Sequence, residues 1–324
     1  MCTKLVNASL KRQGMSDIRE SFNNEIGTDF RGEIMYGEML SGHTSIAVGG
    51  PADMYVLPYD AVSLKTCLMF ANDRGLAVLV LGGGTNVIVD DNGYRGMVIS
   101  LKHFNMIKTT DDPDERVDLF VETGVPLQRL INYCIERGYA GIEGLTGIPG
   151  TVGGAIIGNS GSFGQEIRDV VESIVVINLS GMIKRLERDE FSFGYRRSSV
   201  EQGLIILSAN MRFKKSEPEV LSGKASECIS RKKNTQPLSE RSAGCVYMNP
   251  EGRAAGMLIE EAGCKGMRAG DIEVSRVHAN YFINRGNGTA SDFLKLMKMV
   301  EARVFEHSGV SLEPEVRVIA GKHE

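Results

Sequence analysis

A fifteen-residue stretch at 147–161, GIPGTVGGAIIGNSG, holds six glycines. Glycine has no side chain to bury and costs conformational entropy on folding, so such a cluster is expected where the backbone takes a positive φ or closely approaches another body. That body is either a neighbouring strand or a ligand. A second glycine run, at 82–84, follows the apolar stretch AVLVL. Two such loops can present backbone N–H groups to a diphosphate from two sides, so the pair favours a bound cofactor.

The familiar nucleotide-binding motifs do not account for these glycines. The run at 82–84 leads into β-branched residues and a turn at 90–93, whereas a Rossmann fingerprint leads into a helix. The stretch SGKAS at 222–226 contains Gly-Lys but lacks the other residues of a Walker loop. A tight turn between strands remains the alternative interpretation of the 81–89 segment. The short side chains of Asn86, Asn159 and Ser160 fit either interpretation, because such residues also form plain turns.

Composition restricts the class of protein without identifying it. The chain has 324 residues, 42% hydrophobic and 24% charged, which is usual for a soluble globular protein of two or three domains. A net charge of −4 argues against a surface built for nucleic acid, which normally carries excess basic charge. No apolar run approaches the ~18 residues that a membrane span needs.

The cysteines and histidines indicate neither disulfides nor a metal site. The six cysteines form no C-x-x-C pair, which is typical of reduced thiols, and the five histidines have no zinc-ligand spacing. The N-terminal residues lack the apolar stretch of a signal peptide. We therefore expect a cytoplasmic protein without a bound metal, in which residues 1–30 form a loosely attached extension.

Hydrophobic periodicity and capping residues predict two α/β units before residue 214. The first has a strand at 53–57, a helix at 60–74 capped by Asp60 and Gly75, and a strand at 77–82. The second has a strand, a helix, the glycine-rich segment, a hairpin that turns at Ser180–Gly181, and a further strand. Its remaining expected elements are at 119–123, 126–137 and 203–213. Beyond the polar stretch at 214–218 we expect helices at 219–234, 254–262 and 290–307 and strands at 278–284 and 312–321.

Seven segments occur in an order that resembles one known family. They are TSIAVGGPAD (44–53), LGGGTNVIVDDNG (81–93), GLTGIPGTVGGAIIGNSG (144–161), FGYRRS (193–198), TQPLSERSAGCVYMNP (235–250), KGMRAGDIEVSRVHANYFINRGNGTASD (265–292) and LEPEVR (312–317). Together they resemble the UDP-N-acetylenolpyruvoylglucosamine reductases, flavoenzymes of peptidoglycan precursor synthesis. The likeness covers nearly the whole chain from about Thr44 onward. No long insertion follows YRRS, which resembles the shorter class of the family, without an extra tyrosine-bearing loop over the substrate.

The resemblance implies an α+β fold. A two-part FAD-binding domain of the vanillyl-alcohol-oxidase (PCMH) type would be followed by a smaller α+β substrate-binding domain. On this interpretation the N-terminal extension covers residues 1–30 and the FAD-binding domain covers 31–215, with subdomains at about 31–101 and 102–215. The substrate-binding domain covers 216–324, and its C-terminal strand returns to the active site.

The resemblance also implies the reaction. NADPH would deliver hydride to N5 of a non-covalently bound FAD, and the enolpyruvyl ether of UDP-N-acetylglucosamine would then take hydride at C3 and a proton at C2, giving UDP-N-acetylmuramate. The partners would be these small molecules alone, without nucleic acid or membrane, and the protein would be a monomer.

Three positions match the family's catalytic residues. Arg196, in YRRS, would face the substrate carboxylate, whose charge grows in the transition state, and Glu315, in EPEVR, would assist proton and charge management. Cys245 stands at the proton-donor position, where many members carry serine. A thiol with a reference pKa of about 8.5 is a stronger acid than a hydroxyl and stays mostly protonated near neutral pH. A small buried hydrophobe is the alternative interpretation of this cysteine.

Binding residues follow from the same matched segments. Asn249, Lys233 and Asn280 would bind the substrate, although Met248 stands where the family often has lysine. Arg231 and Lys232 share the basic end of that helix with Lys233, where three cations also complement the helix dipole. The expected FAD-binding residues are Thr44, Gly82, Gly83, Gly84, Thr85, Asn86, Thr146, Gly147, Ile148, Pro149, Gly150, Gly153, Gly154, Asn159 and Gly161.

Two other functions remain as alternatives. One is a flavin oxidase on the same fold, and the other is a catalytically idle protein that binds a flavin or nucleotide. The three differ in whether NADPH reduces the flavin and whether the UDP-enolpyruvyl sugar reoxidises it quickly.

Overall fold

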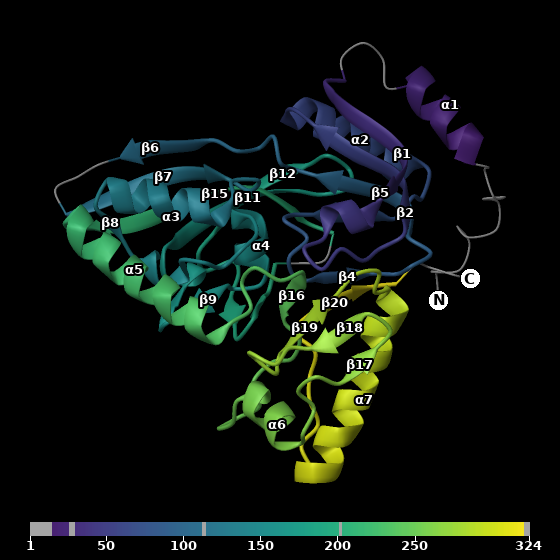
Figure 1. The fold of residues 1–324 in the computed structure, drawn as a ribbon. Coiled ribbons are helices and arrows are strands. Elements are labelled where there is room, and N and C mark those ends of the chain that lie inside the picture. Colours follow the sequence, from purple (N-terminus) through teal and green to yellow (C-terminus); the bar gives the residue numbers. More distant parts are fainter. Residues whose placement is uncertain (1–14, 26–29, 112–114, 201–202, 321–324) are drawn as a thin grey trace, which may run out of the picture.

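The computed structural model describes residues 15–25, 30–111, 115–200 and 203–320. Three packed bodies follow one another along the chain, and the last strand returns from the third body to the first (Figure 1). The first body holds β1 to β5 and α2, the second holds β6 to β15 with α3 and α4, and the third holds β16 to β19 with α6 and α7.

The first body is a four-stranded sheet in the order β1-β2-β5-β3. The three strands β2, β5 and β3 run parallel, and β1 is antiparallel to β2. Helix α2 begins as expected, because the Asp60 carboxylate accepts the Ser63 backbone N–H at 2.8 Å, and Gly75 follows its end at φ +61°. The elements are β1 (Gly32–Met39), β2 (Pro51–Pro58), α2 (Ala61–Asp73), β3 (Val78–Leu81), β4 (Val87–Val89) and β5 (Tyr94–Ser100).

The second body is built on an antiparallel sheet in the order β12-β11-β15-β7-β6, to which β8 adds beside β15. The expected hairpin joins β11 to β12, with Gly181 at φ +77° in its turn. The helix predicted at 126–137 is α3 (Leu127–Glu136). The strands are β6 (Ile107–Asp111), β7 (Arg116–Glu122), β8 (Tyr139–Ala140), β11 (Val171–Ile177), β12 (Ile183–Glu187) and β15 (Ile205–Lys215), with short pairs β9 (Gly161–Ser162), β10 (Gln165–Glu166) and β13 (Phe193–Gly194), β14 (Arg197–Ser198).

The glycine-rich segment is not wholly a loop, which corrects the sequence-based expectation. It contains the short helix α4 (Val152–Ile157), whose N-cap Thr151 side chain accepts the Gly154 backbone N–H. Val152 and Ile156 are fully buried in the core of the second body, and this burial fixes a helix that the glycines alone do not favour.

The third body is a four-stranded sheet in the order β16-β19-β18-β17, covered by α6 and α7. Before it, helix α5 (Pro218–Thr235) lies along the second body, beside α3 (Figure 1). The domain boundary near residue 216 stays a prediction, since α5 follows that boundary but packs on the earlier body. The elements are β16 (Ser242–Cys245), α6 (Ala255–Glu261), β17 (Arg268–Ala269), β18 (Ile272–Val274), β19 (Tyr281–Asn284) and α7 (Ala290–Ser308).

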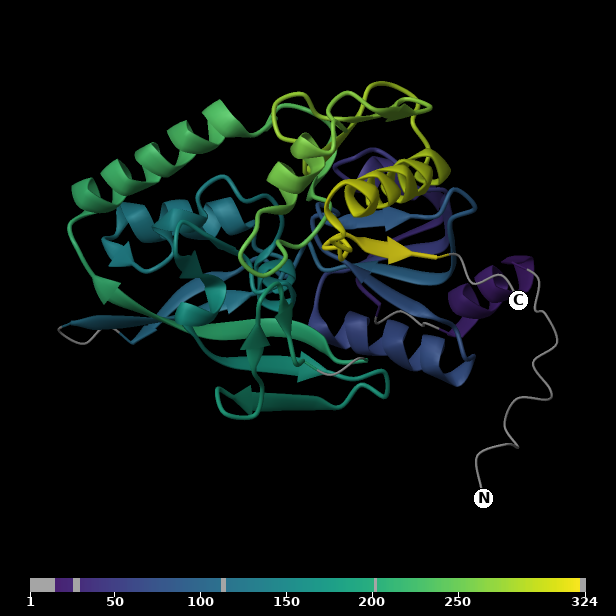
Figure 2. The ribbon, with the colours of Figure 1, turned by 90° about the horizontal axis from the view of Figure 1, so that it is seen from below.

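The end of the chain returns to the first body. Strand β20 (Arg317–Ile319) pairs in parallel with β4, and Figure 2 shows it lying beside the strands of that body. It is shorter than the predicted strand at 312–321. The Asp91 carboxylate of the first body also accepts the Ala290 and Ser291 N–H groups at 2.7 and 2.9 Å, so it caps α7 from across the interface.

The described part of the N-terminal extension is docked, contrary to expectation. Helix α1 (Met15–Glu25) places the fully buried Phe22 edge-on to Phe30 and Phe70, with ring centroids 6.2 and 4.7 Å away. Residues 1–14 lie outside the described residues. No helix within the described ranges is long and apolar enough to cross a membrane.

Candidate active site

Arg196 occupies a strained turn between β13 and β14. Its backbone φ is +56°, a conformation that residues with a Cβ rarely adopt and that costs energy. One terminal guanidinium nitrogen donates to the Gly161 carbonyl at 3.0 Å. The Nε atom lies 3.2 Å from Glu315 Oε1, close enough for an ion pair, yet it is buried without a hydrogen bond to any described residue. The turn therefore holds a guanidinium whose Nε–H group can still donate a hydrogen bond to a ligand.

Glu315 is fixed by its backbone from two sides. Its carbonyl accepts the Asn86 side-chain amide at 3.1 Å, and its N–H donates to the Val246 carbonyl at 2.8 Å. Burial raises the pKa of the Glu315 carboxyl, while the Arg196 guanidinium acts in the opposite direction. Asn86, predicted as a cofactor ligand, thus also positions a catalytic candidate.

Cys245 ends strand β16, next to the same ion pair. Burial raises the pKa of its thiol to about 12; the Glu315 charge adds to this effect and Arg196 opposes it. The thiol therefore stays protonated across the neutral range and up to a higher pH than its reference pKa of about 8.5 implies. Tyr281 lies opposite Cys245 on β19, and its side chain lowers the pKa of the thiol, against the effect of burial.

The three catalytic candidates thus come together from distant parts of the chain. Arg196 belongs to the second body, Cys245 to the third, and Glu315 to the segment that returns to the first. The chemical capacity of this group is a cation for a carboxylate, beside a thiol whose raised pKa keeps its proton and a carboxylate paired with the cation.

The two glycine loops lie against one another. A Cβ on Gly83 would lie 2.8 Å from the Gly150 Cα, and one on Gly82 would lie 2.8 Å from the Thr151 hydroxyl oxygen. A Cβ on Gly84 would lie 1.9 Å from the His43 carbonyl. Neighbouring chain therefore already requires bare backbone at these three glycines. Their predicted close approach to a ligand stays a prediction.

Other positions in the loops have their own physical reasons. Gly147 and Gly150 take positive φ values of +83° and +117°, and Thr85 lies over the second loop, its hydroxyl 3.4 Å from the Pro149 carbonyl. The Ile148 N–H donates to the Leu145 carbonyl, within the same loop.

Asn159 carries an acceptor that the protein leaves unused. The residue is fully buried at φ +41°, and its amide nitrogen donates to Glu166 and to the Gly194 carbonyl, both at 3.0 Å. Its Oδ1 atom has no hydrogen-bond partner among the described residues. Buried acceptors are seldom left unpaired, so this atom fits a ligand with an N–H donor, such as a flavin ring.

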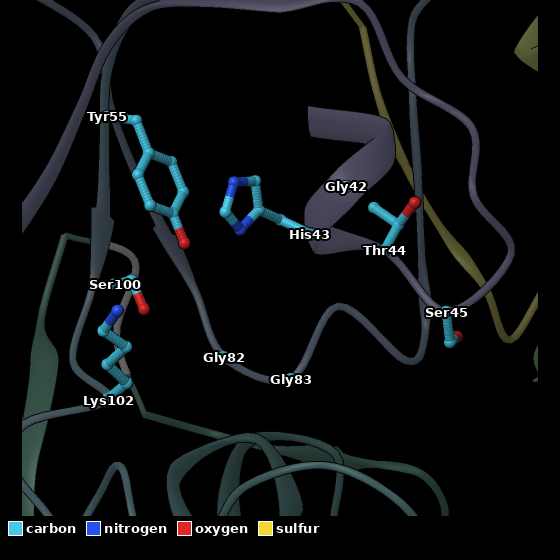
Figure 3. Close-up of a pocket in the computed structure, with 9 residues that line it drawn as sticks. All are labelled: Gly42, His43, Thr44, Ser45, Tyr55, Gly82, Gly83, Ser100 and Lys102. Carbon is cyan, nitrogen blue, oxygen red and sulfur yellow. The ribbon is translucent and has the colours of Figure 1, made fainter. Parts of the chain in front are cut away.

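A cavity of about 360 Å³ opens beside the first glycine loop (Figure 3). The predicted residues Thr44, Gly82 and Gly83 line it. The cavity lies where the parallel strands β3 and β5 end, since Leu81 pairs with Ser100. Sequence reasoning missed part of its lining, although residues that follow neighbouring parallel strands are a known signal of a ligand site. The missed lining residues are Gly42, His43, Ser45, Tyr55, Ser100 and Lys102.

Lys232 is the buried cation at the end of α5 and contacts the segment before the second glycine loop, whereas the predicted substrate contact of Lys233 stays a prediction. Lys233 is exposed, whereas Lys232 is 4% exposed and donates from Nζ to the Thr146 carbonyl at 2.7 Å. Burial lowers the pKa of Lys232 to about 8, and no described carboxylate pairs with it. One position along a helix turns a side chain by about 100°, which sequence reasoning did not resolve here.

Asn280 and Asn249 are engaged by the protein itself. The Asn280 side chain accepts the Tyr247 N–H at 2.9 Å and donates to the Tyr247 carbonyl at 2.8 Å. Its predicted contact with substrate is therefore replaced by a role in holding the strand after Cys245. The exposed Asn249 accepts the Ala255 N–H at 2.9 Å with its side-chain oxygen, which leaves its amide nitrogen for a ligand.

No group of three or more potential metal ligands lies among the residues that the structure describes.

Comparison with known proteins yields two matching family models. Residues 52–187 match an FAD binding domain, and residues 236–319 match the C-terminal domain of UDP-N-acetylenolpyruvoylglucosamine reductase. The expected α+β fold, an FAD-binding domain followed by a smaller C-terminal domain, is confirmed by these matches together with the structural match below.

Whole-chain relatives carry the same name. The UDP-N-acetylenolpyruvoylglucosamine reductase of Syntrophus aciditrophicus is 38% identical over 89% of this chain and 92% of its own length. That of Rubrobacter xylanophilus is 41% identical over 88% of this chain and 94% of its own length. The crystal structure of the Thermus caldophilus reductase superposes with a TM-score of 0.76 at 32% identity, covering 90% of this chain and 99% of that one.

Proposed function

The chain belongs to the UDP-N-acetylenolpyruvoylglucosamine reductase family and is therefore an oxidoreductase with an FAD-binding domain, and we propose that it reduces the enolpyruvyl ether of UDP-N-acetylglucosamine with NADPH through non-covalently bound FAD. The observation that carries this proposal is the convergence of Arg196, Cys245 and Glu315 beside the glycine loops.

The residues around the loops fit the cofactor. The unused Asn159 acceptor suits a flavin N–H, and the 360 Å³ cavity beside Gly82 and Gly83 adds the Lys102 cation on its wall (Figure 3). Bound FAD would supply the capacity to take hydride from NADPH and pass it to the substrate carbon. Lys232, a buried ammonium without a carboxylate partner, would favour negative charge in the adjacent loop.

The substrate steps fall to this chain's own residues. Arg196 binds the carboxylate of the enolpyruvyl group, and its charge stabilises the negative charge that spreads into that carboxylate. Cys245 donates its thiol proton to C2, since its raised pKa keeps the proton available. Glu315 balances Arg196 in the resting site. Asn249 contributes its free amide nitrogen to the UDP moiety.

The two half-reactions test the proposal and its alternatives. The purified protein should be yellow and release FAD in acid, and anaerobic NADPH should bleach the flavin absorbance. The UDP-enolpyruvyl sugar should restore the absorbance rapidly. Recovery with oxygen alone at the same rate would indicate an oxidase, and no bleaching with NADPH or NADH would indicate an idle flavin-binding protein. A colourless protein that takes up no FAD would overturn the proposal.

The location and the oligomeric state of the protein are also part of the proposal. We infer a cytoplasmic monomer that acts on small molecules, without nucleic acid or membrane. Size-exclusion chromatography with light scattering tests the oligomeric state, and an apparent mass of twice 35.3 kDa would exclude the monomer.

A further inference from the structure

Cys245 has a cross-strand partner that the proposed reaction does not yet use. Strands β16 and β19 are antiparallel, and their register sets Cys245 directly opposite Tyr281. Residues opposite each other in such a pair have side chains on the same face, with Cβ atoms about 4.5–5.5 Å apart. The two side chains are close enough to affect each other's pKa: the phenol lowers that of the thiol, and the thiol raises that of the phenol.

The Tyr281 hydroxyl has a second partner. It donates to Gln236 Oε1 at 3.2 Å, at the end of helix α5. A phenol has a single O–H donor but can accept through its lone pairs. While that proton points to Gln236, the phenol oxygen can only accept from the thiol S–H. Once the thiol proton has left, the phenol can turn and donate to sulfur.

We propose that Tyr281 is a positioning residue for the proton donor: it exchanges its hydrogen bond from Gln236 to Cys245 sulfur as the thiol gives up its proton. The proposal rests on the proposed role of Cys245. In the step, the S–H bond breaks, a C2–H bond forms, and the S–H electron pair stays on sulfur as a thiolate. Water then returns a proton to the thiolate.

The charges around the thiol make such a donor useful. Glu315, before β20, disfavours a negative sulfur, while Arg196, in the β13–β14 turn, favours it. Arg196 is also paired with Glu315 and hydrogen-bonded to Gly161, so its charge is shared. A neutral O–H that turns toward sulfur only when charge appears there stabilises the thiolate without depleting the resting thiol of its proton.

The first test is Tyr281→Phe, with Tyr133→Phe as the matched control. Tyr133 lies on α3 in the second body, with its hydroxyl 3.4 Å from Thr109, so its loss removes a comparable hydrogen bond elsewhere. Loss of a hydrogen bond to a charged group predicts about tenfold slower flavin recovery by substrate in Tyr281→Phe. Bleaching by NADPH should be unchanged in both variants, and Tyr133→Phe should recover at the wild-type rate.

A double-mutant cycle separates this proposal from the role of Cys245. In a Cys245→Ala background, Tyr281→Phe should cause no further slowing. If Cys245→Ala alone recovers at the wild-type rate, the role of Cys245 is wrong. If Cys245→Ala is slow but Tyr281→Phe alone matches wild type, the role of Tyr281 is wrong and that of Cys245 stands.

The second test reads the thiol without any turnover. Iodoacetamide labelling of Cys245 in the oxidised holoenzyme at pH 9 is quantified by peptide mass spectrometry, which separates it from the other cysteines. Tyr281→Phe should label about threefold more slowly, because a tenfold loss of thiolate is partly offset by higher nucleophilicity. Gln236→Leu frees the phenol for sulfur and should label faster. Equal labelling in wild type and both variants would overturn the proposal.

Discussion

Cys245 shows how burial changes the chemistry that a residue type suggests. A thiol acts as an acid only below its pKa, and burial raises that pKa to about 12. We therefore expect the rate of flavin recovery by substrate to show no decline from thiol ionisation between about pH 7 and pH 10. Stopped-flow measurements across this range test the expectation.

Variants at Cys245 complete that prediction. Cys245→Ser should keep the flat profile, and Cys245→Ala should slow recovery by about 10²-fold or more while NADPH bleaching stays intact. A wild-type decline centred near pH 8.5 that disappears in Cys245→Ser would contradict the raised pKa.

The ionised Glu315 carboxylate should lower the stability of the folded protein at neutral pH, although the proposed reaction uses it. Its folded-state pKa is raised by burial, so between the unfolded and folded pKa values the folded state binds the extra proton. The free energy of unfolding therefore falls as pH rises through that window. We expect Glu315→Gln, which is neutral, to lose this fall. In urea melts, the free energy of unfolding of Glu315→Gln should rise relative to that of wild type from pH 4 to pH 8, although the variant should show slower flavin recovery by substrate. A constant stability difference over this range would exclude the linkage.

The sequence motifs predicted which residues come together at the candidate site better than they predicted the direction in which side chains point. The resemblance selected Arg196, Glu315 and Cys245, and the structure brings these three together. The motifs did not indicate that Lys232 is buried or that the Asn280 side chain bonds to Tyr247, because the orientation of a side chain depends on tertiary packing that a motif does not encode. The strained φ of Arg196 was also invisible in the sequence.

Within the glycine-rich segment, adjacent glycines should respond differently to the same methyl group. A Cβ on Gly153 would lie 1.8 Å from the Thr123 hydroxyl oxygen, whereas one on Gly154 would lie 3.6 Å from the Thr151 hydroxyl oxygen, an ordinary contact. Gly153→Ala should therefore unfold at lower urea or fail to accumulate. Gly154→Ala should fold and, if this exposed face holds FAD, weaken FAD binding by about tenfold or more.

Melting curves of the apoprotein and FAD titrations measure the two effects separately. Wild-type FAD affinity in a folded Gly154→Ala would exclude that face from the cofactor site. Wild-type stability in Gly153→Ala would show that Thr123 yields to the methyl group.

Elements with strong local signals were predicted well, and those made by distant contacts were not. Helix α2 begins at the predicted cap Asp60, and α7 matches the helix predicted at 290–307. The Thr289 hydroxyl oxygen caps α7 by accepting the Asp292 N–H at 3.0 Å. Strand β4 was not predicted, and the strand expected at 312–321 is only three residues long, as β20, because both strands are limited to the residues that pair with each other across more than two hundred residues. No local pattern sets the length of such a pair.

Across the whole molecule, the bodies share their cores. Ile46 and Ile88 of the first body are buried in the core of the third, and Ile99 shares a core with Ile177 and Ile205 of the second. The arrangement of the catalytic candidates Arg196, Cys245 and Glu315 depends on these shared cores, since the three residues come from different bodies. The order of the motifs along the chain could indicate the bodies but not this sharing, which arises only when the sheets pack.

The N-terminal helix should contribute to stability without contributing to catalysis. Phe22 is fully buried in the same core as Phe70, and its helix lies on the outer side of the first body, beside β1 and α2 (Figure 1). Removing a buried phenylalanine side chain typically costs about 3–5 kcal/mol, because apolar contact is lost and a cavity remains. Phe22→Ala should lower the free energy of unfolding by that order, measured by urea melts followed by circular dichroism.

Phe305 offers a matched control for this prediction. It is 57% exposed on α7, so Phe305→Ala should change the free energy of unfolding by less than about 0.5 kcal/mol. Below their melting temperatures, both variants should retain wild-type rates for bleaching by NADPH and recovery by substrate, since neither residue contacts the catalytic group. If Phe22→Ala is as stable as Phe305→Ala, α1 is not docked and the loosely attached extension expected from the sequence is correct. If Phe22→Ala is as stable as wild type but bleaches or recovers more slowly, the N-terminal helix affects the catalytic candidates through the shared core as well as stabilising the fold.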